Sequence, residues 1–114
     1  MIAKLFMRIL VAGGLGWLLY LVGCSPAPTK SKAQTYTVEI KQMQFQPAVL
    51  QLHSGDTVWF INRDMVEHTA TEATSKRWSS PKLKSDSSWK VAIGHSADYY
   101  CTIHPVMKGK IVVQ

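Results

Sequence analysis

Four side chains that can bind a transition metal stand in the second half of the chain. Cys101, His104 and Met107 follow one another with the spacing C-x-x-H-x-x-M, and His68 lies well upstream of them. A thiolate, two imidazoles and a thioether form a soft, mixed donor set that suits copper rather than calcium or magnesium. Two His, one Cys and a weakly bound axial Met is the donor set of copper sites that transfer single electrons.

The three C-terminal donors cannot meet on an extended strand, because consecutive side chains of a strand point to opposite faces. We therefore expect a sharp loop after Cys101, helped by Pro105, with His68 supplied by a distant segment. Each residue alone has a simpler interpretation: Cys101 as a buried thiol, Met107 as a core residue and His104 as a surface residue. A structural zinc site on the cysteine and both histidines is a further alternative, in which the thioether has no evident purpose.

The composition is that of one small folded domain. The chain has 114 residues, of which 46% are hydrophobic and 10% aromatic, and its formal net charge is +6. This length excludes a Rossmann or barrel enzyme, and the aromatic and aliphatic content argues against a disordered chain. Without the N-terminal targeting segment, about eighty residues are left to fold, which favours a binding or carrier module.

The elements that must position the donors are predicted to be strands. Short segments rich in Val, Ile, Thr and Tyr, separated by turn residues, are typical of a β-sandwich or barrel. No window places apolar residues at helical spacing, so we expect an all-β fold. The candidate strands are 35–40, 48–53, 57–62, 66–72, 89–93, 97–101 and 110–113.

A Ser- and Lys-rich stretch from Thr74 to Ser88 predicts a long connection, which Trp78 and Leu83 anchor to the core. The cations in and beside this stretch have two interpretations, a solvated loop or a surface that steers an acidic partner. These cations are Lys76, Arg77, Lys82, Lys84 and Lys90.

Other residues of metal-binding type are expected to play no part in the site. His53 and His95 are predicted to be solvent-facing turn residues. Met43 and Met65 are interpreted as packing residues, with the rim of the metal end as the alternative place for Met65.

The first residues predict a secretory signal peptide. Two cations and no acid precede an apolar run over 9–22, and the run ends in Leu21-Val22-Gly23-Cys24. A cationic start, a short apolar core and small residues before the cleavage point define such signals. The final tetrapeptide resembles the lipobox of bacterial lipoproteins, which implies a signal peptide over 1–23 and lipidation of Cys24. The alternative is an uncleaved anchor; either one tethers the domain outside the cytoplasm, as a membrane-anchored periplasmic or cell-surface protein.

Residues 24–34 predict a lipid-anchored linker, because the segment is rich in Pro and Ser and has no apolar periodicity. Its extended reach is on the order of 30 Å. The folded domain is then expected over 35–114.

From Tyr36 to Gln114 the sequence resembles the cupredoxins, the plastocyanin and azurin family of small blue-copper proteins. The resemblance rests on Phe45-Gln46-Pro47, on 55–62, on His68-Thr69 and, most sharply, on 99–113. The two-residue gap between His104 and Met107 is similar to that of the amicyanin branch. The resemblance implies an antiparallel Greek-key β-sandwich with one type 1 copper at one end, bound by His68, Cys101 and His104, with Met107 as axial ligand.

Three departures from the family pattern lie close to these residues. Many relatives have Pro before the first histidine and Asn after it, where this chain has Glu67 and Thr69. In the family the Asn helps to tie the two ligand segments together by hydrogen bonding, and Thr69 offers a hydroxyl in its place. Glu67 should favour Cu(II) and lower the potential. The usual Pro-Gly-x-Tyr approach to the cysteine is replaced by residues 94–97.

The donor set and the resemblance together predict a carrier of single electrons, with a redox protein as donor and another as acceptor. A cytochrome, a dehydrogenase or an oxidase is expected to dock near His104 through a small apolar patch. The alternative is a copper-buffering or copper-delivery lipoprotein that uses the same ligands.

An enzyme is not expected, because Met107 closes the position that a substrate would need. Nucleic acid is not an expected partner either, since the chain from Cys24 onward has eleven Lys and Arg against seven Asp and Glu, a net charge of +4. These cations are not interleaved with aromatic residues on one element. We expect a monomer.

Overall fold

The computed structural model describes residues 14, 16, 22–27 and 31–114. The chain divides into two units, Met1–Lys30 and Ser31–Gln114. The predicted signal peptide lies mostly outside the described residues, so its cleavage stays a prediction. The described part of the first unit is exposed and has no regular secondary structure, and no helix in the described part of the chain has the length and apolarity of a membrane span.

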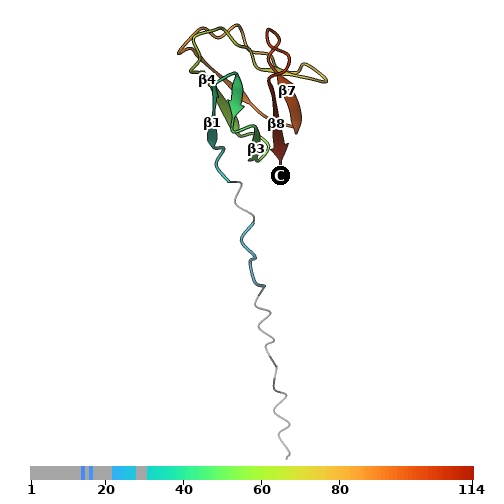
Figure 1. Cartoon of the computed structure of the whole chain (residues 1–114). Helices are drawn as coiled ribbons and strands as arrows, with labels where there is room; N and C mark the ends of the chain where they lie inside the picture. Colours follow the sequence, from blue (N-terminus) through green and yellow to red (C-terminus); the bar gives the residue numbers. More distant parts are fainter. Residues whose placement is uncertain (1–13, 15, 17–21, 28–30) are drawn as a thin grey trace, which may run out of the picture. The chain divides into compact units, whose positions relative to one another are not determined.

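The second unit is a sandwich of two four-stranded sheets (Figure 1). One sheet has the order β2-β1-β4-β6 and the other β3-β8-β7-β5. The strands are β1 (Thr35–Lys41), β2 (Gln44–Gln46), β3 (Val49–Leu52), β4 (Thr57–Asn62), β5 (Thr71–Glu72), β6 (Ser88–Ala92), β7 (Ala97–Tyr100) and β8 (Lys108–Val113). The predicted all-β sandwich is confirmed.

Both sheets are mixed, where a wholly antiparallel sandwich was expected. β1 pairs with β4 in parallel and β3 pairs with β8 in parallel, while the other pairs are antiparallel. The parallel pairs arise because β3 crosses to the second sheet after the β1–β2 hairpin. The chain then returns as β4, running in the direction of β1.

The predicted strands are confirmed with slightly different ends, except in two places. The sequence missed β2, since Gln44–Gln46 has one apolar residue and the turn before it uses Gln42 and Met43 at positive φ instead of glycine. The segment predicted as a strand over 66–72 is a strand only at Thr71–Glu72. Residues before it form a loop, which a bridge between His68 and Leu83 links to the long connection.

Aromatic rings fill the core between the sheets. Tyr99 packs edge-on against Phe45 and Phe60, with ring centroids 4.7 and 5.4 Å apart. Trp78 lies 5.7 Å from the Tyr99 ring and 6.0 Å from that of Phe60. Gly109 allows this packing, because a Cβ at that position would collide with the Tyr99 ring.

The long connection is anchored to this core as predicted. Leu83 is 2% exposed, and Trp78 packs against the buried cluster. His53 and His95 are exposed, also as predicted.

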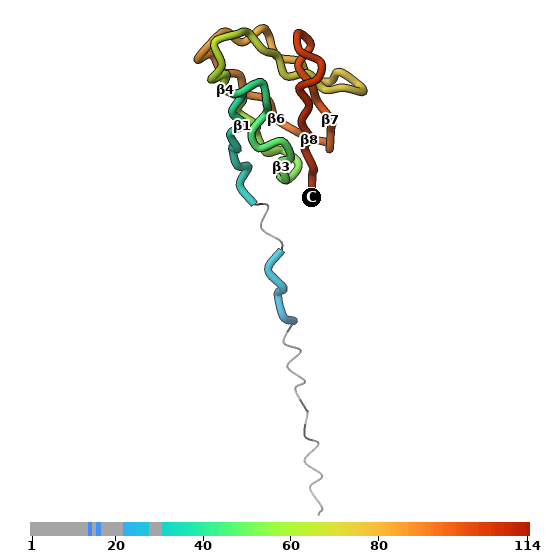
Figure 2. Tube along the Cα trace, in the orientation of Figure 1, coloured from blue at the N-terminus to red at the C-terminus, as the bar shows by residue number. Residues whose placement is uncertain are grey.

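The loops that carry the predicted metal donors lie at one end of the sandwich. β1 and β4 are parallel, so Thr35 and Thr57 start at the same end. The loops over 63–70, 73–87 and 101–107 gather at the other end, away from the C-terminus (Figures 1 and 2). We call this the loop end.

Candidate metal centre

Cys101 begins a tight loop directly after β7. Its amide donates to the carbonyl of Met107 at 3.1 Å, and the amide of Met107 donates to the carbonyl of His104 at 2.9 Å. These two bonds close the loop on itself, which is the sharp turn that the spacing predicted. The loop brings the Cys101 thiol, which is fully buried, close to the half-buried ring of His104.

His68 comes from the loop between β4 and β5. Its backbone amide donates to Leu83 at 3.1 Å and its carbonyl accepts from Leu83 at 2.8 Å. This bridge holds His68 against the long connection, and its side chain is fully buried. The His68 and His104 rings lie edge to face, with centroids 4.9 Å apart.

Three of the four predicted donors converge. Sγ of Cys101 lies 3.8 Å from Nδ1 of His68 and 3.7 Å from Nδ1 of His104, and the three atoms lie within 4.8 Å of one another. Metal bonds of about 2.3 Å to sulfur and about 2.05 Å to nitrogen, meeting at about 120°, would separate these atoms by about 3.8 Å. The donor set therefore fits a single metal ion with near-trigonal geometry.

Met107 is 2% exposed and belongs to the buried cluster. Its backbone bonds to Cys101 and His104 keep it at the base of the same loop. The structure thus places the backbone of Met107 on the loop of Cys101 and His104 and its side chain in the buried cluster.

Thr69 ties the two donor segments together. Its amide donates to Sγ of Cys101 at 3.3 Å, while its hydroxyl oxygen accepts from the Thr102 amide at 2.8 Å. The two threonine hydroxyls also share a hydrogen bond of 2.8 Å. The hydroxyl that Thr69 offers in place of the family's Asn thus links the two donor segments. The bond to sulfur also stabilises a thiolate, because hydrogen bonds to the charged form favour it.

The sequence analysis missed Asp64. Its Oδ2 lies 2.8 Å from Nε2 of His68, on the side of the ring opposite Cys101. The same carboxylate accepts the amides of Gln42 at 2.7 Å and Met43 at 3.0 Å, in the β1–β2 turn. Burial raises the pKa of Asp64, but these two amides and His68 together bring it below its ordinary value. The i, i+4 spacing to His68 was the available signal, and it is weak outside a helix.

Asn62 is the second residue that the sequence analysis missed. It is fully buried, and its amide group donates to the carbonyls of Val66 and Leu83 at 2.8 Å each. Its side-chain oxygen accepts the Asp64 amide at 2.9 Å. Asn62 therefore fixes the loop that carries both Asp64 and His68.

Glu67 was expected to act electrostatically on the metal because it precedes His68. In the structure Glu67 is exposed, and Asp64 is the carboxylate in contact with the histidine ring. We therefore expect Asp64 to have a stronger electrostatic effect than Glu67 on His68.

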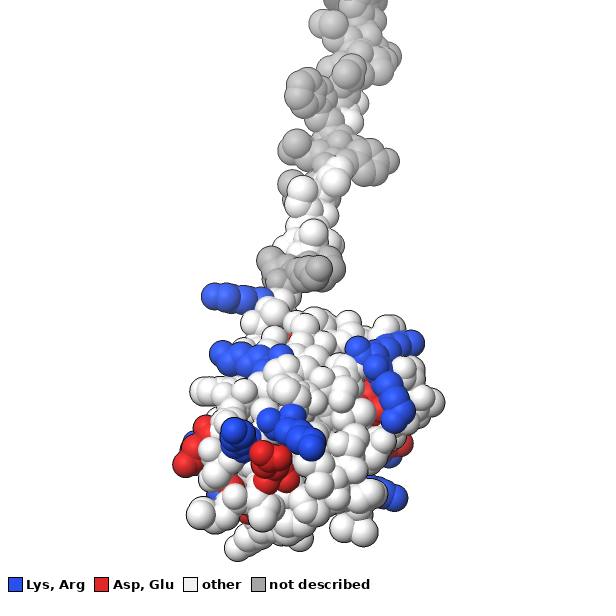
Figure 3. Space-filling view, turned by 90° about the horizontal axis from the view of Figure 1, so that it is seen from above, with Lys and Arg blue, Asp and Glu red and all other residues white. Residues whose placement is uncertain are grey.

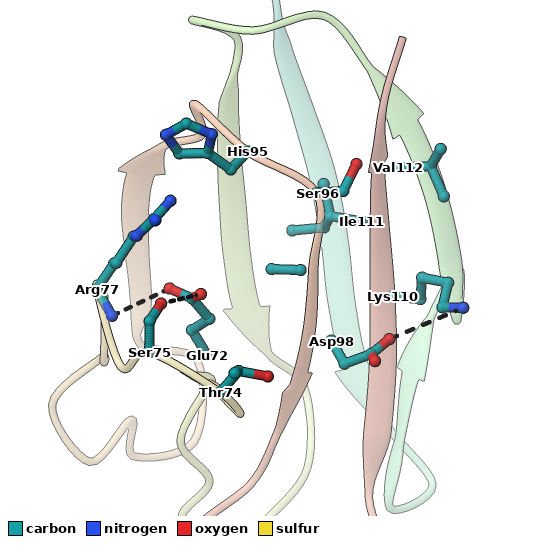
Figure 4. Close-up of a pocket in the computed structure, with 11 residues that line it drawn as sticks. Glu72, Thr74, Ser75, Arg77, His95, Ser96, Asp98, Lys110, Ile111 and Val112 are labelled. Carbon is teal, nitrogen blue, oxygen red and sulfur yellow. Dashed lines mark hydrogen bonds and ion pairs between the residues drawn. The ribbon is translucent and has the colours of Figure 1, made fainter.

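A polar groove lies on the sheet that contains β5, β7 and β8, and none of the predicted donors lines it. Glu72, Arg77, His95, Asp98 and Lys110 contribute to its lining. Glu72 accepts from Ser75 and from the Arg77 amide, and Asp98 pairs with Lys110 at 3.9 Å (Figure 4). Its carboxylates are thus engaged in local contacts.

Residues 32–114 match the family model for copper-binding proteins of the plastocyanin/azurin family. The chain is 33% identical over 86 residues to the amicyanin of Paracoccus denitrificans, covering 68% of this chain and 63% of that protein. It is 30% identical over 98 residues to amicyanin-alpha of Methylorubrum extorquens, covering 81% of this chain and 82% of the relative. The chain thus spans a little under two thirds of the first relative's length.

Solved structures agree with these sequence relatives. A Cu(I) structure of a substituted amicyanin superposes with a TM-score of 0.65 at 29% identity, covering 70% of this chain and 82% of that one. The match of the family model extends over the whole sandwich and includes all four predicted donors. With its two-sheet fold and its converged Cys and His donors, the chain belongs to the plastocyanin/azurin family of copper-binding proteins.

Proposed function

We propose that this chain is a membrane-tethered carrier of single electrons with one type 1 copper. His68, Cys101 and His104 would hold the copper, with Met107 as the fourth ligand. The observation that carries the proposal is the convergence of a buried cysteine sulfur with two imidazole nitrogens at 3.8 and 3.7 Å. Family membership supports the choice of copper.

Bound copper supplies a one-electron couple, and the residues around it limit the rearrangement between its two oxidation states. The bonds from Thr69 to Cys101 and Thr102, and the contact of Asp64 with His68, restrain the donors from opposite sides. A donor set that moves little lets the electron transfer without a large reorganisation.

His104 is the proposed route of the electron, since its ring is half-buried where the other two proposed equatorial donors are fully buried. Ile103 and Val106, on the same loop, are 40% and 87% exposed. A small apolar contact of this kind suits brief docking, because small interfaces dissociate quickly. The proposed partners are a redox donor and a redox acceptor such as a cytochrome, a dehydrogenase or an oxidase.

The anchor of this carrier is proposed to be lipidated Cys24, after removal of residues 1–23. Ser31 to Gln34 enter the domain at the end opposite the loop end, since β1 begins there. A tether at that end leaves the loop end free for partners. Mass spectrometry of the protein from membranes tests this, expecting an N-terminal Cys24 with attached lipid; an unmodified Met1 would overturn it.

We do not assign an enzymatic activity. Four protein donors around one ion leave no open position for a substrate, which a catalytic metal site requires. The carrier is proposed to act as a monomer.

Copper buffering or delivery is the second candidate, and two exposed thioethers favour it. Met65 is 90% exposed and Met43 is 41% exposed. Both lie beside Asp64, and thioethers are soft ligands for Cu(I). Fast electron self-exchange with copper retained supports the carrier, whereas ready and reversible release of Cu(I) to a chelator supports the buffer.

Copper loading tests the assignment directly. Cu(II) should give an intense blue thiolate-to-copper band at one equivalent, and Cys101→Ser should abolish it. Cys24→Ser, which removes the other cysteine, should leave the band unchanged. A colourless Cu(II) protein, or a band that survives Cys101→Ser, would overturn the proposal. Zn(II) loading serves as the spectroscopically silent reference.

A further inference from the structure

We propose that the loop end docks a redox partner whose own electron-transfer face carries an excess of carboxylates. This proposal rests on the proposed electron-carrier function. It follows from an apolar patch on the loop end, a cationic rim around that patch, and the engagement of nearby carboxylates in contacts of their own.

The apolar patch consists of Met43, Met65, Val66, Ile103 and Val106. These are five of the seven large hydrophobic residues that stand exposed in the described part of the chain. Met65 and Val66 belong to the loop that carries His68, and Ile103 and Val106 to the loop that carries His104. Met43 lines one pocket together with Val106 and Met107. The exposed apolar surface is therefore concentrated around the proposed copper ligands, as at an interaction site.

Lys82 and Lys84 form one side of the cationic rim. They flank Leu83, whose backbone makes two hydrogen bonds with His68. The Leu83 side chain is buried and both lysines are exposed. Two ammonium groups are therefore held next to the segment of a proposed ligand.

Lys108 and Lys76 form the other side of the rim. Lys108 follows Met107 and lines one pocket with Met43 and Val106 and another with Pro105 and Tyr100. Nζ of Lys76 donates to the Tyr100 hydroxyl at 3.1 Å. In the view onto the loop end, Lys and Arg side chains stand on both flanks of the face, with Asp and Glu side chains next to several of them (Figure 3).

The carboxylates near the loop end do not neutralise the positive charge of the rim. Asp64 is turned inward, to His68 and to the amides of the β1–β2 turn. Asp86 lies 3.6 Å from Arg63. Glu67 is exposed, and the register of the His68–Leu83 bridge places it opposite Lys84. Asp98 is exposed in the pocket that Lys108 also lines, and it pairs with Lys110 at 3.9 Å. Four lysines thus stand around the patch, where the exposed carboxylates are Glu67 and two that pair with other cations, Asp86 and Asp98.

An acidic partner is the occupant that this arrangement selects. Complementary charge around a small apolar contact accelerates encounter and excludes basic partners, while adding little to the lifetime of the complex. Rapid arrival and rapid release are what a carrier between two partners requires.

Two small oxidants of opposite charge test the proposal on the copper-loaded full chain. The probes are hexacyanoferrate(III), which is anionic, and tris(phenanthroline)cobalt(III), which is cationic. Each accepts one electron from the Cu(I) protein, leaving Cu(II) and the reduced complex. Rates are measured at about 0.01 M and about 0.15 M ionic strength, where the screening length falls from about 30 Å to about 8 Å.

Single charge reversals distinguish the effect of the cationic rim on these rates from the effect of the protein's net charge. Lys82→Glu and Lys108→Glu should each lower the rate at which the anionic complex oxidises the Cu(I) protein by about threefold or more at low salt. Each should raise the rate of oxidation by the cationic complex. Lys32→Glu makes the same change in net charge at the opposite end and should change both rates much less. Raising the salt should reduce these differences.

Equal effects of Lys82→Glu and Lys32→Glu would overturn the proposal, as would rates that do not depend on the sign of the oxidant. In either case the blue copper band and reversible one-electron redox would persist, so the electron-carrier function would stand. Loss of the band or of redox cycling in the wild-type protein would instead reject the proposed function.

Discussion

The carboxylate of Asp64 lies 2.8 Å from Nε2 of His68, while Nδ1 of the same ring faces the sulfur of Cys101 at 3.8 Å. A ring nitrogen that donates to a carboxylate leaves the other nitrogen free to bind a metal, so this contact fixes the tautomer as well as the orientation. The two amides of the β1–β2 turn hold the carboxylate in place. The β1–β2 turn on the surface therefore supports the buried ring of His68, a proposed ligand.

Replacement of Asp64 by Asn should weaken copper binding, because the contact that orients the His68 ring is altered. We expect Cu(II) affinity to fall by about 10- to 100-fold and the reduction potential to rise, because a negative charge that favours Cu(II) is lost. Competition with a Cu(II) chelator and a redox titration measure both effects. Glu67→Gln removes the same charge next to His68 without breaking a contact in the structure. Equal shifts in the two variants would contradict a role that depends on contact.

Replacement of Thr69 by Val should loosen the link between the two donor segments. The Thr102 amide loses its acceptor, and an unpaired amide at this half-buried position costs about 1–3 kcal/mol of unfolding free energy. Thr69→Ser keeps the hydroxyl and should retain most of the stability. Denaturant unfolding of the metal-free protein measures the difference, and similar losses for Val and Ser would show that the methyl group matters instead.

The candidate donors could be named from the sequence because their chemistry is explicit in residue type and spacing. Cys101 and His104 lie on one loop, so a local turn is enough to bring Sγ of Cys101 and Nδ1 of His104 to 3.7 Å from each other. His68 was named from its residue type as the donor from a distant segment, and the resemblance to the family strengthened that choice. Its bridge to Leu83 has no local signal in the sequence.

The supporting residues were less predictable. Asp64 contacts His68 only because Asn62 organises the intervening loop through side-chain hydrogen bonds to distant carbonyls. These contacts depend on tertiary structure. For the same reason 66–72, which has the composition of a strand, is mostly loop: its backbone partners are the Asn62 side chain and the long connection.

Asp56 should make the domain more sensitive to acid. Its carboxylate accepts the Gln34 amide and the His53 amide at 2.9 Å each, and these bonds lower the pKa of Asp56 below its ordinary value of 3.8. A lowered folded-state pKa adds stability above the unfolded value, and this stability is lost as the pH falls through the folded value.

Asp56→Asn removes this titration. Unfolding free energies measured from about pH 6 down to about pH 2 should fall less steeply in the variant than in the wild type, while the variant is less stable near neutral pH. Glu39→Gln is the matched control, since Glu39 is half-exposed and pairs only with Arg63 on the surface. If Asp56→Asn leaves the fall of the unfolding free energy at low pH unchanged, other carboxylates determine the acid sensitivity.

Tyr99 should limit stability at alkaline pH. Its ring is 1% exposed, and its hydroxyl is a buried polar group without a hydrogen-bond partner in the described part of the chain. Burial raises the pKa of Tyr99 above its ordinary value of 10.0. The neutral form therefore stabilises the fold fully below pH 10, and the stability declines as the pH rises above that value, because the unfolded chain ionises first.

Tyr99→Phe should flatten this alkaline decline and raise the unfolding free energy near neutral pH by about 1 kcal/mol, since an unsatisfied hydroxyl is removed from the core. Tyr36→Phe is the control, because the Tyr36 hydroxyl donates to the Gln34 side chain at 3.2 Å in an exposed contact. Denaturant unfolding at pH 7 and pH 11 separates the outcomes, and a loss of stability in Tyr99→Phe at pH 7 would mean that the hydroxyl has a partner in solution.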